Sequence, residues 1–181
     1  MGKINCLDLK GQHDQIKKEI FEAFEKVYEK TAFSGGPFVE EFEKSFASYT
    51  GSTYAVGVSN GTIALHLAML TLGIGAGDEV IIPANTFIAT AWGVSHAGAT
   101  PVFVDCNADT WEIDTTKIEA AITSKTKAVI GVHLYGQPFD VEALKLICDK
   151  HKIYLVEDAA QAQGARYKGK TVGVFGELAC Y

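Results

Sequence analysis

The sequence is poor in the residues that build metal sites and disulfide frameworks. It has four cysteines and five histidines among 181 residues. The cysteines, at positions 6, 106, 148 and 180, include no Cys-x-x-Cys pair. We therefore expect neither a zinc knuckle nor a disulfide framework, but reduced thiols in a cytoplasmic protein. The histidines are equally dispersed, so we predict no metal site.

Positive charge and long apolar runs are also scarce. The net charge is −6, which argues against a nucleic-acid partner, because phosphate binding needs a basic surface. No apolar run approaches the roughly 20 residues that span a bilayer, and the N-terminus lacks the apolar core of a signal peptide. We expect no membrane partner. Hydrophobic residues make up 48% of the sequence, enough for one sizeable core.

The chain divides into two parts by pattern. Residues 14–30 have the apolar periodicity of an amphipathic helix, and Pro37 begins a second helix that ends near Gly51. We treat residues 1–52 as an N-terminal helical segment, able to pack outside the core or to reach a neighbouring subunit. The Ser34 loop joins the two helices, as a linker or as a ligand contact.

From residue 53 onward, strands alternate with helices. We predict helices at 61–72, 86–96, 115–122 and 141–151, and strands at 54–58, 79–82, 101–104, 128–134, 153–156, 172–175 and 178–181. This alternation predicts an α/β domain with a mainly parallel sheet sandwiched by helices. The last apolar run reaches the final residue without a stop signal, so we expect the chain to be cut off within this domain.

Two carboxylates, Glu157 and Asp158, directly follow the buried strand predicted at 153–156. In open α/β sheets, the carboxyl ends of the strands form the ligand crevice. Asp158 is therefore a candidate to present an acid to a ligand. It could equally be the N-cap of the next helix.

Other strand ends carry candidate ligand-binding residues. Gly61 and Thr62 open a helix whose N-terminus suits a phosphate, although a plain capping loop fits them as well. The spacing is neither a Walker A loop nor Gly-x-Gly-x-x-Gly, which weakens a nucleotide-binding interpretation. Phe87 could stack on a flat ring or pack as a core residue, and His133 could be a ligand contact or a core histidine.

A phosphate-type loop, an aromatic side chain and a carboxylate at successive strand ends suit a flat, cationic, phosphorylated heterocycle. Pyridoxal 5′-phosphate (PLP) has these features. A carboxylate at Asp158 would favour a protonated pyridinium nitrogen. Gln161 could reach the ring hydroxyl with its amide.

Several motifs, in order, resemble a known family. They are Ser59–Thr62 with Ala64–Ala68, then Asp78–Thr90, His133–Pro138 and Glu157–Ala162. The ordered set resembles the DegT/DnrJ/EryC1/StrS sugar aminotransferases, from about Phe33 to the end of the chain. The resemblance implies the large domain of a fold type I PLP enzyme, and a homodimer with active sites at the subunit interface.

The resemblance also implies roles for particular residues. Gly61 and Thr62 correspond to contacts with the cofactor phosphate, and Phe87 to the aromatic that stacks on the pyridine ring. Asp158 corresponds to the partner of the ring nitrogen, and Gln161 to the neighbour of the ring hydroxyl. On the substrate side, the resemblance points to the loop that contains Ser34 and to the motif that contains His133.

The resemblance assigns no catalytic residue within this chain. The Schiff-base lysine of the family would follow shortly after Tyr181. Lys168 and Lys170 do not replace it, because they fall in a polar turn before the next strand. We therefore expect this chain to contain most of the cofactor site and not the catalytic base.

The resemblance implies transfer of an amino group, from glutamate, to a nucleotide-linked keto sugar in amino-sugar and polysaccharide biosynthesis. One alternative is a sugar dehydratase of the same family, in which histidine replaces the lysine. Another is a non-catalytic PLP-binding sensor. A NAD-binding domain is disfavoured because the glycine fingerprint is missing.

Overall fold

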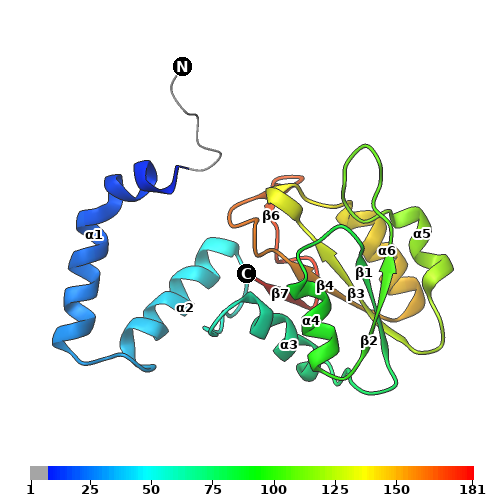
Figure 1. The fold of residues 1–181 in the computed structure, drawn as a ribbon, viewed down its shortest axis with the longest axis horizontal. Helices are drawn as coiled ribbons and strands as arrows, with labels where there is room; N and C mark the ends of the chain where they lie inside the picture. Colours follow the sequence, from blue (N-terminus) through cyan, green and yellow to red (C-terminus); the bar gives the residue numbers. More distant parts are fainter. Residues whose placement is uncertain (1–7) are drawn as a thin grey trace.

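A parallel sheet of five strands forms the centre of the computed structural model, which describes residues 8–181 (Figure 1). The strand order is β2-β1-β3-β4-β7, and every neighbouring pair is parallel. The strands are β1 (Glu79–Pro83), β2 (Thr100–Val104), β3 (Thr126–Val132), β4 (Tyr154–Asp158) and β7 (Leu178–Cys180). The predicted mainly parallel α/β fold is confirmed.

Helices cover both faces of this sheet. Helices α3 (Gly61–Thr71) and α4 (Ala89–His96) pack on one face, and α5 (Thr115–Ala121) and α6 (Val141–His151) on the other. Side chains alternate between the faces along each strand. In β1, Val80 and Ile82 enter the cluster beneath α3 and α4, while Ile81 enters the cluster beneath α5 and α6. An apolar core therefore packs on each face of the sheet, and together the two cores fix the pairing register of its strands.

The two N-terminal helices differ in how they meet this body. In α1 (Leu9–Glu29) no residue is buried, and the helix stands away from the sheet in Figure 1. In contrast, α2 (Pro37–Thr50) approaches the sheet, and the Phe46 ring meets the Tyr181 ring edge-on with 4.9 Å between centroids. Both helices were predicted, and α1 begins five residues before its predicted start.

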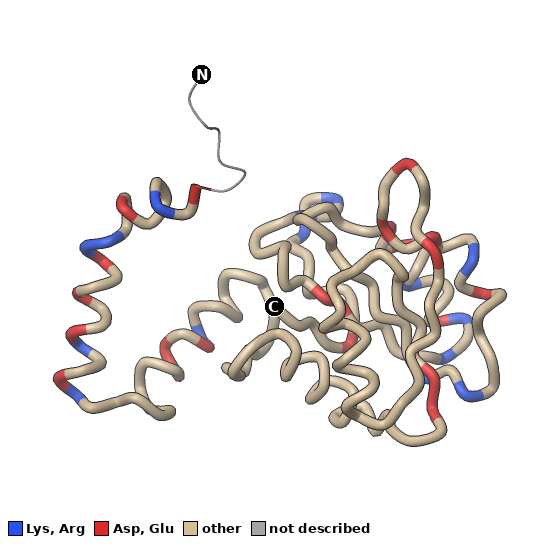
Figure 2. The backbone as a smooth tube through the Cα atoms, viewed as in Figure 1, with Lys and Arg blue, Asp and Glu red and all other residues tan. Residues whose placement is uncertain are grey.

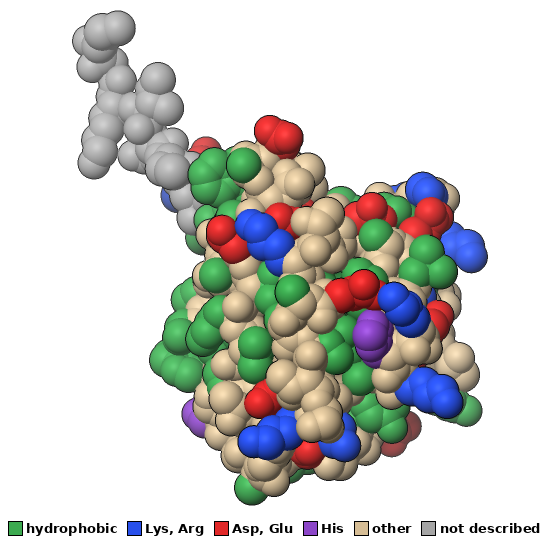
Figure 3. Space-filling view, turned by 90° about the vertical axis from the view of Figure 1, so that its right-hand side faces the viewer, with side chains coloured by type: hydrophobic (Ala, Val, Ile, Leu, Met, Phe, Trp, Pro, Cys, Tyr) green, Lys and Arg blue, Asp and Glu red, His purple; other side chains and the backbone are tan. Residues whose placement is uncertain are grey.

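Charged side chains of both signs are mixed over the described part of the chain. Figure 2 shows the positions of acidic and basic residues alternating along the backbone of α1 and mixed around α5 and α6. In Figure 3, the face on the α5 and α6 side has acidic and basic groups interspersed with apolar ones. That face therefore has no continuous basic stripe. None of the helices from residue 8 onward has the length and apolarity needed to cross a membrane.

Two predicted strands are wrong. Residues 54–58 form an irregular, largely exposed segment without a strand partner, in which Tyr54 is 83% exposed. Residues 172–175 form a turn that follows a short antiparallel hairpin of β5 (Arg166–Tyr167) and β6 (Lys170–Thr171), and the Gly173 and Phe175 amides in it donate to the Glu157 side chain and not to a neighbouring strand. Alternating apolar residues suit a strand, but a strand also needs a neighbour to pair with.

Several predicted boundaries also shift; the strand predicted at 128–134, for example, is β3 at Thr126–Val132 and ends before His133, and two further shifts concern the residues expected to contact the cofactor. The predicted helix at 86–96 begins only at Ala89, so Phe87 lies in the turn before α4 and not in its first turn. The predicted strand at 153–156 extends through Asp158. Both shifts alter where the candidate site residues point.

Candidate functional site

A cavity of about 190 Å³ lies at the carboxyl ends of β1, β3 and β4. Its lining residues come from α3, from the last residues of β3 and β4, and from the segments that follow the three strands. They are Gly61, Thr62, Leu65, Thr86, Phe87, Ala89, Val132, Leu134, Asp158, Ala160 and Gln161. The structure thus brings together all five residues predicted to hold the cofactor. It does so at the edge of the sheet where open α/β proteins bind ligands.

Asp158 contributes a buried carboxylate to the cavity wall. The residue is 6% exposed, and Oδ2 accepts a hydrogen bond from Thr90 Oγ1 at 2.8 Å while Oδ1 accepts one from the Ala160 N–H at 3.3 Å. Burial raises the pKa of Asp158, and the Thr90 and Ala160 hydrogen bonds offset only part of that rise. No lysine or arginine is among the groups that act on this pKa. The site therefore holds an acid that a cationic ligand would stabilise in its ionised form.

The first turn of α3 forms another part of the cavity wall. Asn60 caps the helix, since its Oδ1 accepts the Ile63 N–H at 3.0 Å. The amides of Gly61 and Thr62 have no intrahelical acceptor, because the first four N–H groups of a helix lie ahead of its hydrogen-bond ladder. A Cβ atom at Gly61 would lie 3.4 Å from the Tyr181 carbonyl oxygen. These amides and the helix dipole suit an anionic group.

Phe87 and Gln161 complete the cavity. Phe87 is 65% exposed, so it is not the core residue of the alternative interpretation, and its ring is available to a ligand. Gln161 is oriented by its own hydrogen bond, in which Oε1 accepts the Tyr135 N–H at 2.9 Å. That bond leaves the Nε2 group of Gln161 as the donor for a ligand.

Glu157 points away from this cavity, although it is adjacent to Asp158 in β4. Its carboxylate is fully buried and accepts N–H groups from Gly173, Phe175 and Gly176, each at 2.7 Å. It also contacts His133 Nε2 at 3.0 Å. Burial by itself would raise the pKa of Glu157, but the hydrogen bonds from His133 and the three amides together bring that pKa below its ordinary value. Glu157 therefore anchors the turn that leads into β7.

His133 and Ser34 do not line the cavity. His133 has no exposed surface, and its ring stacks on Phe139 with 4.4 Å between centroids. This is the core-histidine alternative, and it does not support a substrate contact within this chain. Ser34 is exposed in the loop between α1 and α2. Its substrate role stays a prediction.

The polar turn read from the sequence also lies outside the cavity. Lys168 Nζ pairs with Glu142 at 2.5 Å, and Lys170 lies in the β5–β6 hairpin. Neither residue lines the cavity.

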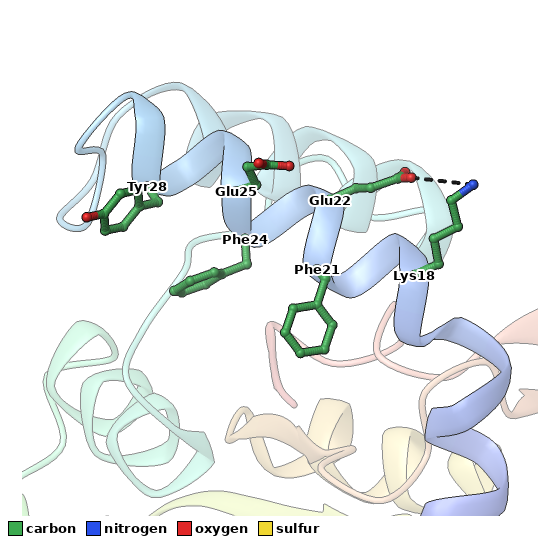
Figure 4. A pocket seen from close by; sticks show the side chains of 6 residues that line it. All are labelled: Lys18, Phe21, Glu22, Phe24, Glu25 and Tyr28. Carbon is green, nitrogen blue, oxygen red and sulfur yellow. Dashed lines mark ion pairs between the residues drawn. The ribbon is translucent and has the colours of Figure 1, made fainter.

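A second hollow lies along α1 and is shown in Figure 4. Phe21, Phe24 and Tyr28 line it together with Glu25 and the Lys18–Glu22 ion pair. Phe21, Phe24 and Tyr28 are each at least 60% exposed. The hollow is thus an exposed apolar helix face and not an enclosed site.

Sequence reasoning missed Thr90 and Thr86. Thr90 is fully buried in α4, and its hydroxyl oxygen lies 2.9 Å from that of Thr86, which lines the cavity. A threonine inside an apolar helix gives no distinctive pattern. Only the contact across 68 residues to Asp158 identifies it. Among residues 8–181, no group of His, Cys, Asp and Glu is arranged to hold a metal ion.

Comparisons with known proteins agree on one family. Residues 14–181 match the model of the DegT/DnrJ/EryC1/StrS aminotransferase family. A pleiotropic regulatory protein of Geobacillus stearothermophilus is 46% identical over 98% of this chain and 48% of its own length. The dTDP-3-amino-3,6-dideoxy-alpha-D-galactopyranose transaminase of Aneurinibacillus thermoaerophilus is 47% identical over 97% of this chain and 48% of its own length.

A solved structure shows the same fold. The crystal structure of NtdA from Bacillus subtilis, with its bound cofactor PMP, matches with a TM-score of 0.91 at 35% identity. The match covers 99% of this chain and 40% of that chain. This chain therefore spans about half the length of the relatives it matches.

Proposed function

We propose a function from the premise that this chain belongs to the DegT/DnrJ/EryC1/StrS aminotransferase family. The full-length protein binds PLP and transfers an amino group to the keto carbon of a nucleotide-linked sugar. One observation carries this proposal: the five residues expected to contact the cofactor come from separate parts of the sequence and line one cavity. The transaminase relative supports the substrate class.

The cavity fits PLP in its chemistry. The α3 N-terminus suits the phosphate, the exposed Phe87 ring suits the flat pyridine, and Asp158 suits a protonated ring nitrogen. Burial raises the pKa of this carboxylate, and no lysine or arginine is among the groups that act on it, so such a cation would stabilise its ionised form. When bound, PLP would supply an electron sink for the carbon that carries the amino group.

The chain's own residues would then orient and polarise that group. Asp158 would hold the proton on the ring nitrogen by its charge. Gln161 would donate from Nε2 toward the ring hydroxyl, because its Oε1 is held by the Tyr135 N–H. Gly61 and Thr62 would bind the phosphate through their amides and the Thr62 hydroxyl. Asp158 ends β4, Gly61 and Thr62 begin α3, and the Tyr135 N–H holds the Gln161 side chain, so these groups are positioned before the ligand arrives.

The finer parts of the proposal depend on the family resemblance. We propose glutamate as the donor, amino-sugar or polysaccharide biosynthesis as the process, and the cytoplasm as the location. The free thiols of Cys106, Cys148 and Cys180 support a reducing compartment. The division into residues 1–52 and 53–181 and the Schiff-base lysine after Tyr181 stay predictions.

We also propose a homodimer. The exposed apolar face of α1 supports it, because a face with Phe21, Phe24 and Tyr28 at least 60% exposed is typical of a surface that a partner covers. In such a dimer, the α1–α2 loop with Ser34 could approach a site from the neighbouring subunit.

The first test is the visible absorption spectrum of the full-length protein with PLP, before and after borohydride reduction, followed by peptide mapping. A yellow protein with the pyridoxyl label on a lysine, and amino transfer from glutamate to a dTDP- or GDP-linked keto sugar, is the expected result. PLP that binds but is never fixed to a lysine would favour the dehydratase or sensor alternatives. The name of the transaminase relative does not favour the dehydratase. A protein that cannot bind PLP would refute the proposal.

A further inference from the structure

A buried chain of hydroxyl groups runs from the cavity wall to Asp158. Thr86 lines the cavity, its Oγ1 lies 2.9 Å from Thr90 Oγ1, and Thr90 Oγ1 donates to Asp158 Oδ2 at 2.8 Å. Thr90 has no exposed surface, while Thr86 is half-buried. All three side chains belong to the rigid sheet edge and to α4 or the turn before it.

The direction of this chain follows from counting hydrogens. A hydroxyl has one hydrogen, and Thr90 uses it for the Asp158 carboxylate. In the Thr86–Thr90 contact, Thr86 must therefore be the donor. This leaves Thr86 only acceptor lone pairs for a ligand in the cavity. The chain is aligned toward Asp158 as long as that carboxyl is ionised.

We propose that Thr90 is a positioning residue that keeps the Asp158 carboxylate ionised and in one orientation toward the cavity. Thr86 fixes the direction of the Thr90 hydroxyl. The inference deepens the proposed function and depends on it only for the ligand that Asp158 faces. Thr90 would act on that ligand through Asp158 and not by contact, since it does not line the cavity.

The surroundings of Asp158 make this hydrogen bond important. Burial disfavours the ionised form, and the Thr90 hydroxyl is the strongest of the groups that oppose it, ahead of the Ala160 amide and the charge of His133. Cys180 on β7 is the other titratable group nearby. Burial, and to a smaller extent the charge of Asp158, raise the pKa of its thiol to about 12. The Cys180 thiol is therefore neutral at physiological pH. The Thr90 hydrogen bond to Asp158, at 2.8 Å, is also shorter than the one from the Ala160 amide, at 3.3 Å.

The test measures the pKa of Asp158 in the cofactor-free, full-length protein. Aspartate labelled with ¹³C at the carboxyl carbon is followed by NMR over pH, and Asp158→Asn identifies the signal. Thr90→Val keeps the shape of the side chain and removes the donor. A hydrogen bond to a charged group corresponds to roughly one to two pKa units, so we expect the midpoint to rise by about that amount.

Three other variants make the result specific. Thr90→Ser keeps the hydroxyl and should stay close to the wild type. Thr86→Val should raise the midpoint by less than Thr90→Val, and it tests the chain independently if Thr90→Val does not fold. Thr50→Val is the matched control, because Thr50 is buried and its hydroxyl bonds the Phe46 carbonyl in α2. This control should leave the Asp158 midpoint unchanged.

An unchanged midpoint in Thr90→Val, or an equal shift in Thr50→Val, would overturn the inference. If Thr90→Val does not fold, an unchanged midpoint in Thr86→Val overturns it. Since the titration needs no cofactor, the two proposals can fail separately. A protein that shows the shift but binds no PLP refutes the proposed function and leaves the link between Thr90 and Asp158 standing. A protein that binds PLP but shows no shift of the Asp158 midpoint refutes the link between Thr90 and Asp158 and leaves the proposed function standing.

Discussion

Replacing Glu157 by glutamine removes a buried negative charge without changing the size of the side chain. In the wild type, Oε1 accepts the Phe175 and Gly176 amides, and Oε2 accepts the Gly173 amide and contacts His133. The glutamine carbonyl can keep the first pair of amides. Its NH₂ group must then face the Gly173 N–H, so two donors oppose each other in a site without exposed surface.

The cost can be worked out from these contacts. One buried donor left unsatisfied costs about 1–3 kcal/mol, and the remaining bonds lose their charge assistance. We expect Glu157→Gln to lower the free energy of unfolding by about 2–4 kcal/mol at pH 7, measured by urea denaturation of the full-length protein. Glu43→Gln is the matched control. Glu43 accepts a single amide, that of Gly57, at 2.7 Å in a partly exposed position, and its loss should cost below about 1 kcal/mol.

The pH dependence gives a second check on the same variant. The folded-state pKa of Glu157 lies below its ordinary value. The carboxylate therefore contributes its stability above the unfolded pKa, near 4.5, and loses it as the pH falls through the lower folded value. The difference in the free energy of unfolding between the wild type and Glu157→Gln should become smaller below pH 4.5. A gap under about 0.5 kcal/mol at pH 7 would refute the anchoring role of Glu157.

Three further predictions concern single side chains. Asp158→Asn should lower turnover at least about 100-fold if Asp158 holds the ring proton, and near-normal turnover would restore the capping interpretation. The same variant should raise the melting temperature of the cofactor-free protein at pH 7, because the raised folded-state pKa of Asp158 makes its ionised carboxylate destabilising. Phe87→Ala should weaken PLP binding roughly three- to tenfold, measured by fluorescence titration against Ile88→Ala, which changes an exposed neighbour outside the cavity. Burial raises the pKa of Glu112 to about 8, so the melting temperature of the wild type should fall as the pH rises from 4.5 to 8. Glu112→Gln should remove that part of the fall. Parallel curves of melting temperature against pH for the two proteins would contradict this.

Much of the fold could be predicted because its signals are local. Helix α6 begins and ends at its predicted residues, since Asp140 caps it and Lys152 ends it in a left-handed conformation. The ordered motifs indicated the family, and the match over residues 14–181 confirms that resemblance. The segment at 54–58 failed because its strand pattern depends on a neighbour that the described residues do not place beside it.

The candidate site was predictable only in part, for a geometric reason. Positions at strand ends converge on one edge of a parallel sheet, so Phe87 and Asp158 could be assigned together before any coordinates. Thr90 could not, because its role depends on a contact between α4 and β4. His133 was ambiguous in sequence. Its burial against Phe139 and Glu157 follows from the end of β3 and not from its own motif.

Glu157 and Asp158 point to opposite faces of the sheet, so both side chains reach their sites only when β4 is paired in the correct register. A slip of one residue along the sheet would exchange their faces. In one direction of slip, Asp158 would take the place of Glu157 beside the turn amides, with a shorter side chain, and Ala159 would take the place of Asp158 at the cavity. Such a misaligned chain would lose the anchor before β7 and the acid in the cavity in the same event. Only a sheet with the correct register therefore has this ligand site. A molecule that binds there would selectively stabilise the correctly paired sheet during folding.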